Sequence, residues 1–186
     1  MIKRIIGIVI PLLTCGTLFA QDYVMFQTSI LKLRAGENVK LQAGVKKHND
    51  KYHNGKDRAK AYLWYINTGP NSGNYSWATG PIKFSHMDQI FQDDHIKDWE
   101  KNVSPYADET NVVFMMRDEE MTYNPENEVV AENILMKRIP IKNGQKHVEA
   151  VEEAVQKIAK ALRRTRSNIA RRVYRDAFPD GHQEIT

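Results

Sequence analysis

The stretch Leu31-Lys32-Leu33-Arg34-Ala35-Gly36-Glu37-Asn38 decides the fold, because it ends a strand, makes a turn and begins a helix. A second stretch, Ile139-Pro140-Ile141-Lys142-Asn143-Gly144-Gln145-Lys146, has the same design. In each stretch, two apolar residues are separated by one residue, as in a half-buried strand, and a glycine follows three positions after the second apolar residue. A spacing shared over so long a distance predicts two related units rather than a short-period repeat protein.

The chain around the first stretch predicts the order strand, helix, strand, strand, helix, strand. Alternating β-branched and aromatic residues predict strands at 23–33, 59–67, 75–79 and 111–116. A helix follows Gly36, with Val39 and Ala43 on its expected buried stripe, and a second helix follows Ser85, where Asp88 takes the place of a capping-box acid. This order is that of a ferredoxin-like βαββαβ unit and predicts an α+β protein.

The second unit is expected to be incomplete. A strand is predicted at 134–141, where Pro140 is typical of an edge strand or a strand end. The most regular helical pattern in the chain follows, with an apolar stripe of Val148, Val151, Val155, Ile158 and Leu162. Residues 169–178 fit a strand or a helix. The unit would then lack its remaining elements and leave an unpaired sheet edge near Thr186.

The first 20 residues have the pattern of a secretory signal, with a basic start, an apolar run at 5–13 and a cleavage position after Ala20. The apolar run is short for a membrane span, so we expect a secreted or periplasmic mature chain without a transmembrane segment. Cys15, the only cysteine, gives the alternative of a lipid anchor, although Thr14 is an awkward residue before a lipidated cysteine. The predicted organisation is a signal peptide at 1–20, a ferredoxin-like repeat at 21–120, a linker at 121–132 and a partial repeat at 133–186.

The composition is that of an ordinary globular protein, with 41% hydrophobic and 27% charged residues. A formal net charge of +4 over 186 residues gives no reason to expect nucleic acid as a partner. Basic residues gather between Lys157 and Arg175. A solvated helix and strand face explains this cluster better than a polyanion-binding surface.

Four large aromatic residues, Tyr62, Trp64, Tyr75 and Trp77, lie on the two strands of one predicted hairpin. Together with His86 they are the candidate residues for binding a small apolar or aromatic ligand. Cross-strand packing in the core is the alternative explanation, and for large aromatic residues it is the more common one. No Gly-x-Ser-x-Gly elbow and no phosphate-binding glycine loop occurs, so the catalytic residues are unknown.

The six histidines do not predict a metal centre from their spacing. His48 and His53 are five positions apart and His86 and His95 are nine apart, so neither pair has the i, i+4 spacing of helical metal ligands. We therefore expect no metal and no cofactor. A metal site formed by distant residues, or a single haem-ligating histidine, is the lesser alternative, with His86 and His147 the first to test.

The order of elements and the repeat resemble the dimeric α+β barrel superfamily, in which ferredoxin-like units pack sheet against sheet. Its NIPSNAP-like members and secreted proteins of Bacteroidota type are the nearest in general appearance. Trp99-Glu100-Lys101-Asn102-Val103-Ser104-Pro105-Tyr106 resembles the helix end that precedes the last strand of such a unit. The resemblance implies a cavity between paired sheets, formed by self-association or by pairing of the two repeats.

The resemblance also supplies the functional expectations. The first is a protein that binds a small apolar or aromatic ligand in that cavity. The alternatives are a cofactor-free monooxygenase or haem-handling enzyme that uses the same cavity, and a structural domain whose sheets serve dimerisation. The Asn, Trp and His that some haem-degrading members carry have no identifiable counterparts in this chain.

Overall fold

The computed structural model describes residues 23–87, 92–126, 130–142, 144–178 and 183–186. The fold is α+β, as predicted, and its strands form one antiparallel sheet in the order β2-β3-β1-β4-β6-β7-β5. The predicted signal segment and Cys15 lie outside the described residues. Within the described residues, no helix combines the length and the apolar character needed to cross a membrane.

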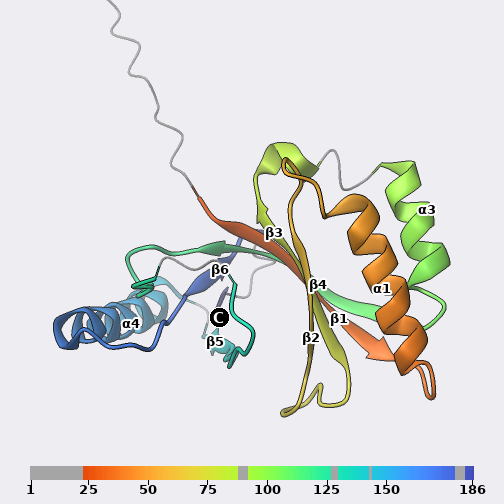
Figure 1. Ribbon diagram of the computed structural model, residues 1–186. Coiled ribbons are helices and arrows are strands. Elements are labelled where there is room, and N and C mark those ends of the chain that lie inside the picture. Colours follow the sequence, from red (N-terminus) through yellow and green to blue (C-terminus); the bar gives the residue numbers. More distant parts are fainter. Residues whose placement is uncertain (1–22, 88–91, 127–129, 143, 179–182) are drawn as a thin grey trace, which may run out of the picture.

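The first half of the chain contributes four strands and two α-helices. They are β1 (Met25–Leu33), α1 (Asn38–Tyr52), β2 (Ala61–Tyr65), β3 (Tyr75–Ile82), the short 3-10 helix η1 (Phe84–His86), α3 (Asp93–Asn102) and β4 (Ala107–Arg117). The strands lie in the order β2-β3-β1-β4 with antiparallel neighbours throughout. Figure 1 shows α1 and α3 side by side on one face of these strands.

The second half adds β5 (Ile139–Ile141), α4 (Gln145–Thr165), β6 (Tyr174–Asp176) and β7 (Gln183–Ile185). Its strands follow the order β6-β7-β5, and β6 pairs with β4, so both halves belong to one sheet. The helix α4 lies far from α1 and α3 (Figure 1). The order β6-β7-β5 repeats the order β2-β3-β1 of the first half.

Each half has its own hydrophobic core. The first lies between the sheet and α1 and α3 and contains Leu31, Leu41, Val45, Tyr75, Trp77, Val103 and Ala107. The second lies under α4 and contains Met121, Ile141, Val148, Val155, Val173 and Ile185. The apolar stripe predicted for α4 is thus buried at Val148 and Val155, whereas its member Ile158 is 46% exposed.

The predicted stripe of α1 is wrong. Val39 is 79% exposed, and the residues of α1 that are buried are Leu41, Gly44, Val45 and His48. These positions follow the i, i+3, i+4, i+7 spacing of one helix face. Glycine and histidine are not hydrophobic residues, so the hydrophobic pattern of the sequence does not show this stripe.

The second half also differs from its prediction. Of residues 134–141 only Ile139–Ile141 form a strand, although β5 is an edge strand as Pro140 predicted. Residues 169–178 contain the strand β6 rather than a helix. The unpaired edge predicted near Thr186 is wrong, because β7 is a third strand that pairs with β6 on one side and with β5 on the other.

Candidate metal centre

The C-terminal end of α1 and the residue that follows it supply two buried histidines. His48 lies on the buried stripe of the helix, and its side chain is fully buried. His53 follows directly after the last residue of α1, and its backbone N–H donates to the carbonyl of Asn49 at 2.8 Å. The chain leaves the helix at this point, so the direction of the His53 side chain is not set by the 3.6-residue period of α1. The rings of His53 and His48 therefore lie close together, although the two residues are five positions apart.

Helix α3 supplies a third histidine. His95, Asp98 and Trp99 stand at i, i+3 and i+4 and therefore share one face of the helix. This face packs on α1, where Trp99 contacts the His48 ring with 4.9 Å between ring centroids. The approach depends on Gly44 of α1, because a Cβ at that position would lie 1.8 Å from the carbonyl oxygen of Asn102.

The three imidazoles converge on one point. His95 Nε2 lies 3.2 Å from His48 Nε2 and 3.3 Å from His53 Nε2. One ring nitrogen of each histidine lies within 4.8 Å of those of the other two. We call His48, His53 and His95 the three-histidine centre.

Two neighbours fix which nitrogens of the centre carry hydrogen. His48 Nδ1 lies 2.9 Å from Asp98 Oδ2, and His53 Nδ1 lies 3.0 Å from the carbonyl oxygen of Ala59. A carboxylate and a carbonyl only accept, so each Nδ1 is the donor in the neutral ring. Nε2 of His48 and of His53 are then both unprotonated, and both lone pairs are directed toward His95.

Burial keeps the imidazoles neutral. It lowers the pKa of His53 and that of His95 to about 4. It also lowers the pKa of His48, and the hydrogen bond to Asp98 opposes this effect only in part. Burial alone would raise the pKa of Asp98, but hydrogen bonds from His48 and Lys51 outweigh it and hold that pKa below its usual value. The centre therefore combines neutral imidazoles with an ionised carboxylate behind one of them.

Aromatic rings hold the histidines in place. The His48 ring lies between Trp99 and Tyr52, and its centroid is 5.1 Å from that of Tyr52. The His53 ring packs edge-on against Trp77 at 5.6 Å, and Trp77 in turn contacts Trp99 at 5.0 Å. Trp77 Nε1 donates to Asn49 Oδ1 at 3.1 Å, so its polar group is satisfied. This packing gives each imidazole a fixed orientation.

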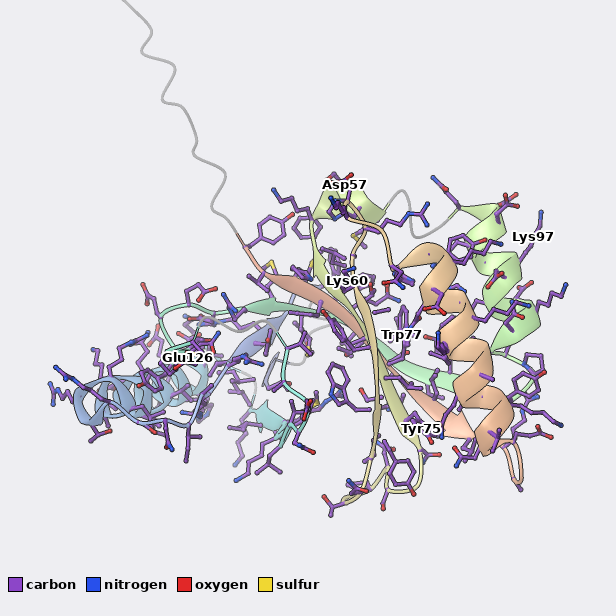
Figure 2. All side chains as sticks on the ribbon, in the orientation of Figure 1. Asp57, Lys60, Tyr75, Trp77, Lys97 and Glu126 are labelled. Atoms are coloured by element: carbon purple, nitrogen blue, oxygen red, sulfur yellow. The ribbon has the colours of Figure 1, made fainter. Side chains whose placement is uncertain are left out.

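The aromatic residues predicted to bind a ligand lie on two opposite faces of the sheet. Leu63 pairs with Trp77 and Tyr65 pairs with Tyr75, and all four side chains face α1. Figure 2 shows Trp77 on the α1 side of the strands. Tyr62 and Trp64 alternate with Leu63 and Tyr65 and so lie on the other face, stacked at 5.6 Å with an interplanar angle of 27°.

This arrangement limits what these residues can bind together. Tyr75 and Trp77 are core residues, 5% and 3% exposed, and Trp77 supports the three-histidine centre. Trp64 is partly buried, and its Nε1 donates to the carbonyl of Ala131 at 3.2 Å. The hollow between β2 and α1 is lined by Tyr62 and Tyr75, one residue of each pair, whereas Trp64 and Trp77 do not line it. Ligand binding at either pair stays a prediction.

His86 is not part of the three-histidine centre. It lies in η1, where its Nδ1 accepts a hydrogen bond from the backbone N–H of Lys83 at 3.1 Å. His147 is exposed in the first turn of α4. Both histidines are therefore suitable controls for experiments on the centre.

The spacing along the chain does not indicate that His48, His53 and His95 converge, because they come from separate elements. Two signals were nevertheless present. His48 completes the i, i+3, i+4, i+7 stripe of α1, and a histidine on a buried stripe needs polar partners. His95 and Asp98 share a helix face with Trp99.

The lowered histidine pKa values predict how the stability of the metal-free protein depends on pH. An unfolded histidine has a pKa of about 6.5, whereas that of folded His53 and of folded His95 is about 4. Between these values the unfolded chain takes up protons that the folded chain does not, so the free energy of unfolding falls as the pH falls from about 6.5 to about 4. Urea unfolding in a chelator across this range measures the slope.

The control for this experiment is His147→Gln, which should keep the slope of the unaltered protein. His53→Gln should reduce the slope, because one of the suppressed titrations is removed. A stability that is constant or that rises on acidification would contradict the prediction.

No protein-family model matches the chain, and no curated protein matches it.

Proposed function

We propose that this protein binds one divalent transition-metal ion, zinc in the first place, through Nε2 of His48, His53 and His95. The observation that carries the proposal is the convergence of the three Nε2 atoms, with distances of 3.2 and 3.3 Å from His95 to the other two. Tetrahedral zinc with Zn–N bonds of about 2.0–2.1 Å requires ligand nitrogens about 3.3–3.4 Å apart. The two distances from His95 match this requirement, and the remaining pair of ring nitrogens, from His48 and His53, lies within 4.8 Å.

The surroundings of the centre support the same conclusion. Metal-binding histidines usually donate their second N–H to a carboxylate or a backbone carbonyl, which fixes the tautomer. His48 has Asp98 and His53 has the Ala59 carbonyl in these roles. Without a cation, only one of the two lone pairs directed at His95 Nε2 can accept its proton in a linear hydrogen bond. A metal ion satisfies all three nitrogens at once.

The chemistry of the donor set selects the class of metal. Three neutral imidazoles suit zinc, copper, nickel and iron, whereas calcium and magnesium prefer oxygen ligands. Among the described residues the group contains no fourth protein ligand. The carboxylate of Asp98 is already held by His48 Nδ1 and by Lys51 Nζ at 3.2 Å. Three protein ligands with a fourth position for water or substrate are typical of catalytic zinc sites, whereas structural zinc sites have four protein ligands.

Metal content and titration test the proposal. The full chain is treated with a chelator, dialysed and titrated with Zn²⁺ in a calorimeter, and the zinc that remains after gel filtration is measured by mass spectrometry. We expect one ion per chain and a thermal midpoint that rises with free Zn²⁺, because the ion binds the folded state. Failure to retain zinc, copper or nickel at one equivalent would overturn the proposal.

We also propose that the first half is a ferredoxin-like unit and that the second half is a partial copy of it. The strand orders β2-β3-β1 and β6-β7-β5 support this relationship, as does the positive φ of Gly36 and Gly144, the two glycines that precede α1 and α4. The signal pattern of residues 1–20 supports export of the chain. Four expectations from the sequence stay predictions. They are membership of the dimeric α+β barrel superfamily, the binding of a small ligand, the oxygenase or haem-handling alternative, and the structural alternative.

A further inference from the structure

The strand β2 forms one edge of the described sheet and offers unused backbone groups. Gly80 N donates to Lys60 O, and Ile66 N donates to Asn74 O, so residues 60 and 66 direct their backbone groups toward β3. Backbone groups alternate in direction along a strand, with a period of two residues. Residues 62 and 64 therefore also face β3, and the groups that point outward belong to Ala61, Leu63 and Tyr65.

The two edges of the sheet differ in their protection. The edge strand β5 has three residues, and one of them is Pro140, which has no N–H to donate. The edge strand β2 has five residues, Ala-Tyr-Leu-Trp-Tyr, with neither proline nor charge. Strands of this kind pair readily with another chain unless something covers them. In the second half, β6 has the corresponding place in the order, and it is paired with β4.

A groove of about 800 Å³ runs beside this edge, between β2 and α1. We call it the α1–β2 groove. Its floor contains Ala61, Leu63 and Tyr75, and its helical wall contains Gln42, Lys46, Asn49 and Asp50. The three residues of β2 whose backbone groups point outward all line the groove, and Tyr62 lines it as well. A strand added to this edge would therefore direct alternate side chains into the groove.

We propose that β2 pairs antiparallel with β2 of a second copy, around a two-fold axis at Leu63, so that two sheets become one. In this register Leu63 lies opposite the partner's Leu63, and Ala61 lies opposite the partner's Tyr65. All three outward-facing residues of each strand then form hydrogen-bonded pairs. A shift in either direction leaves at least one of them unpaired.

The side chains of β2 complement themselves in this register. Tyr65 is 51% exposed, and the partner's Tyr65 would lie over the small Ala61 in the groove. On the other face, Tyr62 would lie opposite the partner's Trp64. Aromatic pairs across neighbouring strands stabilise a sheet by up to about 1 kcal/mol each. Large and small residues meet on one face and large rings meet on the other.

The charges of α1 are also self-complementary. Lys46 and Asp50 form an ion pair on the groove wall. Asn49 is level with the proposed axis, because it accepts from Trp77, the strand partner of Leu63. A two-fold axis at this level brings Lys46 toward the partner's Asp50 and Asp50 toward the partner's Lys46. A surface that matches itself in backbone, size and charge favours a second copy over an unrelated peptide.

Sedimentation equilibrium of the full chain tests the proposal. We expect twice the chain mass of 21.5 kDa. Tyr65→Asp should weaken dimerisation by about 30-fold or more, as for an aromatic residue that anchors an interface. Leu135→Asp makes the same charge change at a side chain 81% exposed outside this surface, and it should leave the dimer intact. Lys46→Asp should weaken the dimer, and adding Asp50→Lys should restore it.

Circular dichroism of each variant confirms that the chain is folded, and the charge pair provides a second test if Tyr65→Asp unfolds. A monomeric unaltered protein overturns the proposal, and binding of an extended peptide at β2 would then take its place. A dimer that is insensitive to Tyr65→Asp, or to Lys46→Asp where Tyr65→Asp does not fold, also overturns it, because the interface must then lie elsewhere.

Discussion

His95→Ala is expected to remove tight metal binding from the protein. His95 Nε2 is the atom that both other ring nitrogens approach, at 3.2 and 3.3 Å, and it comes from a different helix. Replacing an outer partner of a metal ligand costs about 10- to 100-fold in affinity. Loss of a direct ligand from a centre with three protein ligands should exceed this, so we expect the Kd for Zn²⁺ to rise by more than about 100-fold. Competition with a chromophoric chelator measures the change.

Two histidines outside the centre control for a general effect of losing an imidazole. His86→Ala and His147→Ala should leave the Kd unchanged, because one side chain lies in η1 and the other is exposed on α4. Asp98→Asn should raise the Kd for Zn²⁺ by less than His95→Ala but by more than the two control variants. The asparagine keeps a hydrogen-bond acceptor for His48 but loses the negative charge. Equal effects of His95→Ala and His147→Ala would show that the metal binds at another place.

Gly44→Ala is expected to destabilise the protein although it lies inside a helix. Alanine has a higher helix propensity than glycine by about 1 kcal/mol, which alone would stabilise α1. However, its Cβ would lie 1.8 Å from the carbonyl oxygen of Asn102, and that atom belongs to the backbone and cannot turn away. The helices α1 and α3 must separate, and overpacking of this kind costs about 1–3 kcal/mol. We expect a net loss of stability in urea unfolding.

Val39→Ala is the matched control on the same helix, because Val39 is 79% exposed and should change stability little. The Gly44 variant should also bind zinc more weakly, since His48 and His95 lie on the two helices that are forced apart. A more stable Gly44→Ala protein would mean that α1 and α3 do not approach as closely as the structure has them.

The sequence predicted the parts of the fold that are written in local patterns. The stripe of α4 contains valine at three of its five positions, so its helical period is visible in the sequence. Pro140 predicts an edge strand because proline has no N–H to donate to a neighbouring strand. The stripe of α1 was missed because Gly44 and His48 face the core there, one for close approach and the other as a polar group.

The candidate site could not be predicted from the spacing of its histidines in the sequence, for a different reason. His48 and His95 are brought together by the packing of α1 on α3, which is a tertiary contact. The aromatic hairpin shows the same limit. Its strands were predicted correctly, but which rings share a face depends on the pairing of Leu63 with Trp77, and a shift of one residue would reverse it.

His53 belongs to both the three-histidine centre and the α1–β2 groove. One ring nitrogen approaches the other histidines, and the ring also borders the hollow where the partner's Tyr65 is proposed to lie. Substitutions at this position are therefore expected to be pleiotropic, because one change alters the proposed metal site and the proposed contact surface together.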